Sequence, residues 1–547
     1  MIFRFLAGAR PHRVRVPIGA AALAALSSLA VLPAAAVDAA SAHPTDAHPT
    51  GARPLPAPRA LSAGEQRTDA RLRGLPRDSA AFAAFFRALP KGADLHNHLS
   101  GAVSTEYLIK LAGRDKLCIV EETMTAVQGP CGKGQRPAAD ARKDAAFHRS
   151  LLRAWSMQDF PAGESGHDHF FAAFAKFGEV TWRHTGEILA EVADSAAKQN
   201  QFYLETMVTP ASGAARELAD KVGWNSNLER LHDALRAKGG LNRVVAEARR
   251  EADKADADRR AAGRCATKAP SPGCDVPVRW ISQVSRGGSP ERVFTQMALG
   301  LALAEKDARF VAINLVQPED GESALRHYRL QMRMLDYLHQ QYPDAHITLH
   351  AGELWPGLVK PEDLTFHINE AVRTGHAERI GHGVDLVHED DWQDLARTMA
   401  KRQVAVEVPF TSNAQILGVS GEDHPFRAYR EHGVPLVLAT DDPGISRTDI
   451  GHEYRYAART YDLSYTELKD LARASLEYAF LPGRSLWRGR AASQDYERAE
   501  PCLRDEPGAS ALSTPCADLL AASPKAAVQW RQEAAFDRFE ARWMPAQ

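Results

Sequence analysis

Short apolar runs alternate with longer segments of helical hydrophobic period along most of the chain. The apolar and β-branched runs predict eight β-strands, at residues 93–98, 201–208, 278–284, 310–316, 346–351, 378–383, 404–409 and 434–441. Strands that alternate with helices are typical of repeated βα units around a parallel sheet. Eight such units close a (β/α)8 barrel, whereas a doubly wound open sheet is the other arrangement that this alternation allows.

The positions of the polar residues favour the barrel. Residues able to carry chemistry lie at the ends of the first, fifth, sixth and eighth predicted strands, where barrel enzymes gather their active sites. We therefore predict an α/β protein with a TIM-type (β/α)8 barrel over residues 78–490 and a C-terminal helical extension over residues 491–547. The early gaps between strands are too long for simple crossovers, which predicts insertions near residues 113–166 and 225–273.

The N-terminus has the order of features of an export signal. Four arginines lie before or at the start of an apolar stretch at residues 16–32, and a run of small residues follows at 34–36. A membrane anchor is the alternative, but the stretch is short and rich in alanine. We predict a signal peptide over residues 1–36, no stable membrane span after its cleavage, a flexible leader over residues 37–77, and a periplasmic or secreted protein.

Charge and cysteine usage narrow the expected partners. The 67 basic residues nearly balance 69 acidic ones and no long basic run occurs in the body of the chain, so we expect a small molecule and not nucleic acid as the partner. The six cysteines form three couples close in sequence, Cys118 with Cys131, Cys265 with Cys274, and Cys502 with Cys516. An even count in an exported chain favours disulfides, although the sequence alone does not choose their connectivity.

Two strand ends carry histidines that can meet at one metal ion. His96 and His98 are two residues apart on a predicted strand, so their side chains point to the same face. His350 ends the apolar part of the fifth strand, and Glu353 follows after a glycine that permits a tight turn. Each motif alone has an ordinary interpretation, a packed or exposed histidine pair for the first and a strand-to-helix connection for the second.

Two further strand ends carry residues of the same kind. His382 lies between two glycines, which leave room for a ligand beside the imidazole, although an exposed turn is the simpler interpretation. Asp441 and Asp442 are adjacent carboxylates after an apolar run, and such a pair repels unless a cation or a donor holds it; a solvated turn is the alternative. Together the four motifs can supply three imidazoles and one carboxylate, which suit a single zinc ion.

These motifs, in their order along the chain, resemble the adenosine deaminase family over about residues 89–454. The matching segments are His96-Asn97-His98, His350-Ala351-Gly352-Glu353, Gly381-His382-Gly383, Thr411-Ser412-Asn413 and Thr440-Asp441-Asp442-Pro443. The signal, the insertions and the cysteine couples make the chain similar to the secreted, growth-factor-related branch of the family.

The resemblance implies a role for each of these residues. It implies one Zn²⁺ ion, a protonation of the purine ring atom N1, an attacking water that is oriented or deprotonated, and a contact to N7. The metal ligands would be His96, His98, His350 and Asp441. Glu353 would protonate N1, His382 would orient or deprotonate the water, and Asp442 would contact N7.

Two positions depart from the family's pattern and bear on the substrate. Ser100 stands where many members have an acidic residue that meets the sugar, and Gln317 stands where the family usually has a glycine that contacts the ring. Phe174 follows His167-Asp168-His169 in an apolar run that we interpret as the start of an amphipathic helix, with an apolar lid over the purine as the alternative. Arg286, after the third predicted strand, is interpreted as an ion-pair partner with no catalytic role, and orientation of Glu353 or a neighbour is the alternative.

The expected activity is hydrolytic deamination of adenosine or deoxyadenosine to inosine and ammonia, outside the cytoplasm. Adenine or a modified adenosine is the alternative substrate, and a catalytically silent secreted binding protein on the same scaffold is the alternative function. A two-metal barrel amidohydrolase is disfavoured because residues 310–316 offer no lysine to bridge two ions. The sequence does not report the oligomeric state.

Overall fold

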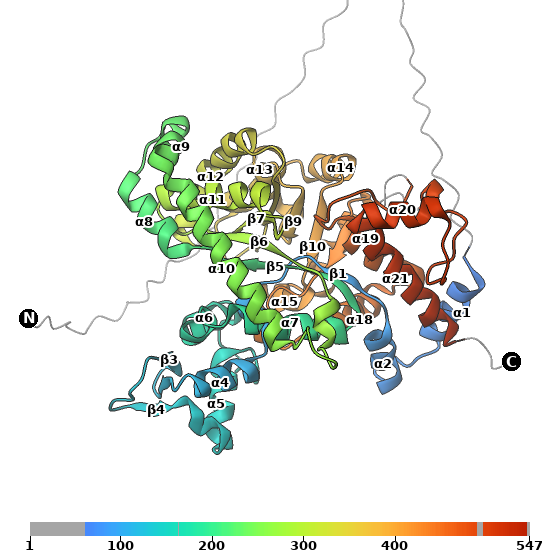
Figure 1. Ribbon diagram of the computed structural model, residues 1–547, viewed down its shortest axis with the longest axis horizontal. Coiled ribbons are helices and arrows are strands. Elements are labelled where there is room, and N and C mark those ends of the chain that lie inside the picture. The colour runs from blue at the N-terminus through green and yellow to red at the C-terminus, as the bar shows by residue number, and fades with distance from the viewer. Residues whose placement is uncertain (1–60, 162, 489–495, 544–547) are drawn as a thin grey trace, which may run out of the picture. The chain divides into compact units, whose positions relative to one another are not determined.

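Eight parallel strands form one sheet at the centre of the molecule, with helices around it (Figure 1). The structure, a computed structural model, describes residues 61–161, 163–488 and 496–543. The strand order is β1-β5-β6-β7-β8-β9-β10-β11, which is that of a TIM-type (β/α)8 barrel and confirms the predicted fold class. The strands are β1 Gly92–Asp94, β5 Gln201–Val208, β6 Val278–Ser285, β7 Phe310–Val316, β8 His346–Ala351, β9 Arg379–His382, β10 Ala405–Val408 and β11 Leu436–Leu438.

The barrel closes between its first and last strands, just beyond the ends of β1 and β11. Asn97 and Asp441 form a parallel bridge. The Asp441 amide donates to the His96 carbonyl at 2.9 Å, and the His98 amide donates to the Asp441 carbonyl at 2.9 Å. The predicted strand 434–441 is too long, because Asp441 adopts a left-handed φ of 60° that a regular strand does not contain. The predicted strand 93–98 is also too long, since β1 ends at Asp94.

Helices cover the outer face of the barrel and side chains fill its interior, so the strands are buried on both faces. All residues of β7 are buried, and all but Asn314 are apolar. The surrounding helices are α2 Ala80–Ala88, α3 Leu99–Ala102, α4 Thr105–Arg114, α7 Thr185–Lys198, α8 Ser212–Val222, α11 Pro290–Lys306, α12 Glu322–Gln341, α13 His367–Arg373, α14 Trp392–Arg402, α15 Phe410–Leu417, α16 Phe426–Glu431, α17 Pro443–Ser446, α18 Ile450–Tyr461 and α19 Tyr465–Glu477.

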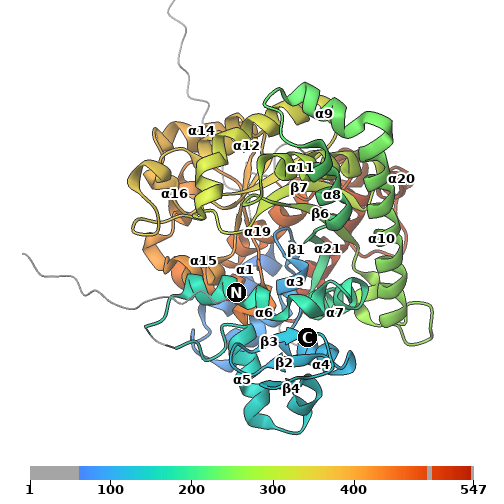
Figure 2. The same ribbon diagram turned by 90° about the vertical axis from the view of Figure 1, so that its left-hand side faces the viewer.

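The first insertion is a small antiparallel sheet followed by a helix. Strand β2 Cys118–Val120 pairs with β3 Thr125–Val127 and β4 Gln135–Pro137, and α5 Ala145–Trp155 comes next. The Cys118–Cys131 disulfide joins β2 to the loop before β4, and the Trp155 indole donates to the Met124 carbonyl at 2.7 Å. In Figure 2 these elements lie together beside the barrel, next to α6 Gly166–Thr181.

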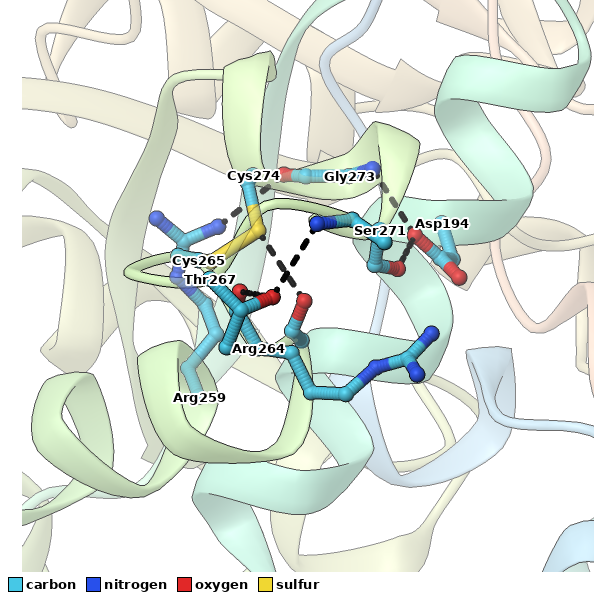
Figure 3. Close-up of a disulfide and its surroundings, with 10 residues drawn as sticks. Asp194, Arg259, Arg264, Cys265, Thr267, Ser271, Gly273 and Cys274 are labelled. Atoms are coloured by element: carbon cyan, nitrogen blue, oxygen red, sulfur yellow. Dashed lines mark hydrogen bonds between the residues drawn. A yellow bond between two sulfur atoms is a disulfide. The ribbon is translucent and has the colours of Figure 1, made fainter.

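The second insertion contains α9 Leu228–Arg236 and α10 Gly240–Ala262, and it ends in a loop that the Cys265–Cys274 disulfide closes (Figure 3). Asp194 of α7 accepts from the Gly273 amide at 2.8 Å and from the Ser271 hydroxyl. The disulfide and these hydrogen bonds together fasten the loop to α7.

The C-terminal extension contains α20 Thr514–Ala522 and α21 Pro524–Ala541. The Cys502–Cys516 disulfide joins the segment before α20 to the first turn of α20. Helix α21 packs against α19 and against α1 Ala63–Arg73. All six cysteines are therefore paired within the three couples close in sequence.

Helix α1 corrects the prediction of a flexible leader that reaches residue 77. Its capping box joins Ser62 and Glu65, whose backbone amides each donate to the other's side chain. The buried Lys469 of α19 donates to Glu65 at 3.1 Å and to Glu540 of α21 at 2.7 Å. These polar contacts hold a segment whose apolar period was too weak to predict a helix. The predicted signal peptide and residues 37–60 of the predicted leader lie outside the described residues.

No helix in the described part of the chain combines the length and the apolar composition that crossing a membrane requires.

Replacing both Cys265 and Cys274 with serine should lower the free energy of unfolding by about 2–3 kcal/mol, because the short closed loop gains entropy in the unfolded chain. Urea denaturation followed by tryptophan fluorescence, in buffer without reductant, measures the change. A midpoint equal to that of the unmodified chain would show that this disulfide contributes no stability.

Candidate metal centre and active site

Four donor atoms from three parts of the barrel mouth lie close together. His96 and His98 follow β1, His350 belongs to β8, and Asp441 follows β11. Nε2 of His350 is 3.1 Å from Nε2 of His96 and 3.2 Å from Nε2 of His98. Oδ1 of Asp441 is 3.4 Å and 3.1 Å from the same two histidine nitrogens. Donors arranged tetrahedrally at about 2.0–2.1 Å from one metal ion are separated by about 3.3 Å, so these spacings fit a single ion.

The opposite nitrogen of each of these three rings faces an oxygen acceptor. Because Nδ1 must therefore carry the proton, each Nε2 presents a lone pair to the centre. The acceptors are Glu407 of β10 for His96 at 2.7 Å, Gln283 of β6 for His98 at 3.0 Å and Asn314 of β7 for His350 at 2.7 Å.

The unsatisfied atoms at the centre also fit a cation. Oδ2 of Asp441 accepts from the Ser412 hydroxyl at 2.7 Å, but Oδ1 is buried and has no hydrogen-bond donor. Burial lowers the pKa of His96, yet its contacts with Asp441 and Glu407 raise it to about 10, which shows that the surroundings favour positive charge. A divalent ion held by the three imidazoles and Asp441 would supply that charge.

His382 and Glu353 stand next to the metal donors. His382 ends β9, and its Nδ1 donates to Oδ1 of Asn413 at 2.8 Å, so the lone pair of its Nε2 faces the centre without a partner. Burial lowers the pKa of His382 to about 4, which keeps the ring neutral. Burial and the charge of Asp441 raise the pKa of Glu353 well above its usual value, which favours the protonated acid.

The backbone of the site is strained. His382, Asp441 and Gln317 have φ values of 66°, 60° and 82°, in the left-handed region that side chains with a Cβ avoid. Such residues gather at functional sites and persist only where neighbouring contacts hold them. The left-handed φ of Gln317 is one that glycine adopts without strain, which explains why glycine is favoured at this position. The side-chain oxygen of Gln317 accepts from the Gly287 amide at 3.1 Å.

A cavity of about 470 Å³ opens onto these donors. Its apolar wall contains Phe170, Phe171 and Phe174 of α6 together with Val316, Pro318 and Ile416. Its polar wall contains Ser100, Thr209, Gln283, Ser285 and Gln317, and its floor contains Glu353 and Asp442 beside the metal donors. The cavity therefore offers a flat apolar group a slot beside two carboxyl groups.

Asp442 approaches the chain closely at Gly101. A Cβ at Gly101 would lie 1.8 Å from Oδ1 of Asp442, so only glycine fits there. This oxygen is buried and lacks a hydrogen-bond partner within the protein, and Asp442 is one of the residues that line the cavity. Asp442 is therefore placed to bind a polar atom of a ligand.

Residues 161–486, more than half of the 547-residue chain, match the family model described as adenosine deaminase. The chain belongs to the adenosine deaminase family. This family comprises metal-dependent hydrolases that act on C–N bonds, in keeping with a buried metal centre beside a cavity. His96 and His98 precede the matched segment, and the fold brings them to it.

Individual relatives match over shorter lengths. The adenosine deaminase of Salmonella typhi is 39% identical over 137 residues, and that of Escherichia coli is 38% identical over 139 residues. Each alignment covers 25% of this chain and only 38% of the relative. Among solved structures, the N6-methyl-AMP deaminase of Arabidopsis thaliana has 22% sequence identity and a TM-score of 0.47, and the match covers 73% of this chain and 94% of that one.

The structure brings the predicted metal ligands and His382 together, and the other predicted site residues, Glu353, Asp442, Ser100, Gln317 and Phe174, line the cavity beside them. Sequence reasoning missed the residues that orient the metal donors, which are Glu407, Gln283, Asn314 and Ser412. Asn314 and Glu407 did leave a signal, because each is a polar residue inside an otherwise apolar strand.

The segment His167-Asp168-His169 begins an amphipathic helix, as predicted, because Ser165 caps α6 at Gly166. His167 also joins this helix to the loop after β7. Its Nε2 is 3.0 Å from Asp320 and its Nδ1 is 3.0 Å from Asp168. The ion pair with Asp320 therefore connects the two walls of the cavity that carry Phe174 and Gln317.

This ion pair should stabilise the protein in a pH-dependent manner. The hydrogen bond with Asp320 raises the pKa of His167, so the stabilisation is complete below the unfolded value of about 6.5 and is lost as the pH rises through the folded value. In a double-mutant cycle of His167→Gln and Asp320→Asn, thermal unfolding should show a coupling of about 0.2–1 kcal/mol at acidic pH and none at strongly alkaline pH. Coupling that is equal at both pH values would contradict this assignment.

Proposed function

We propose that this chain is a zinc-dependent hydrolase that converts adenosine or deoxyadenosine to inosine and ammonia. The observation that carries the proposal is a buried group of metal donors, with His382 among them, that borders a cavity lined by Glu353 and Asp442. Three imidazoles and a carboxylate are ligands that zinc prefers. Bound zinc acts as a Lewis acid and lowers the pKa of a water molecule from about 15.7 towards about 7.

The protein's own groups would complete the reaction around the purine. Glu353, kept protonated by burial, donates a proton to ring atom N1 as negative charge builds on the ring. His382 is neutral, and its free Nε2 accepts a proton from the attacking water. Burial and the charge of Asp441 raise the pKa of Asp442, which favours the protonated acid, so its carboxyl group donates a hydrogen bond to N7. The phenylalanines of α6 cover the apolar face of the base.

The lining of the cavity supports a nucleoside substrate over a nucleotide. The described residues that line it include no arginine or lysine. A phosphate group would enter without a positive partner, and burying an unpaired charge is costly. Serine, threonine and glutamine side chains are suited to the hydroxyl groups of a sugar.

We place this activity outside the cytoplasm. The N-terminal order of arginines, apolar stretch and small residues supports export, and the pairing of all six cysteines agrees with an oxidising compartment.

A substrate screen tests the proposed reaction. Purified protein should contain one zinc ion per chain and should convert the ultraviolet spectrum of adenosine or deoxyadenosine to that of the inosine product. We expect kcat/KM for AMP to be at least about 100-fold lower, since its phosphate lacks a partner. The proposal fails if zinc-loaded protein consumes no 6-aminopurine. A higher kcat/KM for adenine or AMP than for the nucleosides would show that the nucleoside is not the preferred substrate.

Glu353→Gln should retain zinc and lower kcat by about 10²–10⁴-fold, because glutamine keeps the shape of the acid but has no acidic proton to give. Steady-state rates with metal analysis of the same sample measure this. Glu389→Gln is a matched control, because burial also raises the pKa of Glu389, to about 8, and it does not line the cavity. Turnover by Glu353→Gln equal to the control would remove Glu353 from this role.

A further inference from the structure

The turn that carries Glu353 is held by a buried carboxylate that the proposed reaction does not use. Strand β8 ends at Ala351, so the amides of Gly352 and Glu353 have lost the sheet as a partner. Glu319, in the loop after β7, accepts from the Glu353 amide through Oε2 at 2.9 Å and from the Gly352 amide through Oε1 at 3.3 Å. One side chain thus satisfies both backbone donors of the turn.

Glu319 is itself fixed by two buried groups. His367, at the start of α13, donates to its Oε1 at 2.6 Å, and Nη1 of Arg286 lies 3.6 Å from the same oxygen. Arg286, which follows β6, also donates to the carbonyl of His350 at 2.8 Å. The aromatic ring of Tyr328 stacks on His367 with the ring centres 3.8 Å apart, which limits the movement of that imidazole.

These contacts keep Glu319 charged. Burial alone raises the pKa of Glu319, but the hydrogen bond from His367 and the charge of Arg286 outweigh it and lower the pKa. A carboxylate has acceptor sites only, so it receives both amides without a competing donor. The arrangement joins the ends of β6, β7 and β8 at one charged group.

The turn needs this support because its shape is unusual. Gly352 has a φ of 75°, and a Cβ there would lie 2.4 Å from Oδ1 of Asp385. The turn therefore lies between Asp385 on one side and Glu319 on the other. A hydrogen bond to each amide on the Glu319 side sets the direction in which the Glu353 side chain leaves the backbone.

We propose that Glu319, held by Arg286 and His367, is the positioning residue for Glu353, fixing its turn through the amides of Gly352 and Glu353. Its effect on turnover rests on the proposed function of Glu353, but its effect on the turn does not. Displacement of a reacting group by about 1 Å is enough to lower a rate by roughly 100-fold.

Glu319→Gln tests the inference. A glutamine brings an NH₂ group towards at least one of the amides, so one of the two hydrogen bonds is lost. In zinc-loaded protein we expect hydrogen exchange at the amides of Gly352 and Glu353 to rise by about tenfold or more, kcat to fall by roughly 100-fold, and KM and zinc content to change little. Glu319→Asp keeps the charge but not the reach, and should change both readouts in the same direction if Glu319→Gln does not fold.

Glu533→Gln is the matched control, because Glu533 is a buried carboxylate paired with Arg473 at 2.7 Å, far from the turn in the contact between α19 and α21. It should alter stability without changing exchange at the turn or kcat. Unchanged exchange at Gly352 and Glu353 in the Glu319 variants, with kcat within about threefold of the unmodified chain, would overturn the inference. If the unmodified chain deaminates no purine, the proposed function fails, and the exchange measurement still decides the role of Glu319.

Discussion

Closure of the barrel between β1 and β11 is the constraint on which the site depends. The bridge between Asn97 and Asp441 sets the two histidines beside the carboxylate, and the parallel sheet brings His350 to the same mouth. Oδ1 of Asp441 lies 3.1–3.4 Å from the histidine nitrogens and has no hydrogen-bond donor. Without a cation this buried carboxylate oxygen would remain unpaired, which is costly. The strand order of the barrel brings the four donors together, and their unpaired carboxylate oxygen requires positive charge at the same position.

Around this centre, polar side chains from two strands and from helix α15 determine the orientation of the donor groups. Glu407 and Asn314 fix the rings of His96 and His350, and Ser412 fixes Asp441. The same principle extends to the backbone, where several residues of the site have left-handed φ values that only surrounding contacts maintain. Rigidity here comes from hydrogen bonds between neighbouring strand ends, which hold reacting groups in place before a ligand arrives.

Much of this was accessible from the sequence, for identifiable reasons. Apolar runs predicted all eight strands because both faces of a parallel sheet are buried, and Gln201–Val208 and Phe310–Val316 were predicted with their observed bounds. The metal donors were found because they follow those runs. Helix α1 was missed because polar contacts hold it. Glu319 was missed because the groups that it holds in the turn are backbone amides, which leave no trace in a sequence.

The distance along the chain between His96 and Asp441 has a consequence for how the protein matures. The first pair of imidazoles leaves the ribosome long before the aspartate that lies beside them in the fold, and the whole set of intervening βα units must be made in between. Contacts between such remote segments form slowly, because much chain entropy is lost before they are made. The four candidate metal donors therefore come together only late in folding. A metal ion bound to all four would show that the last strand has paired with the first.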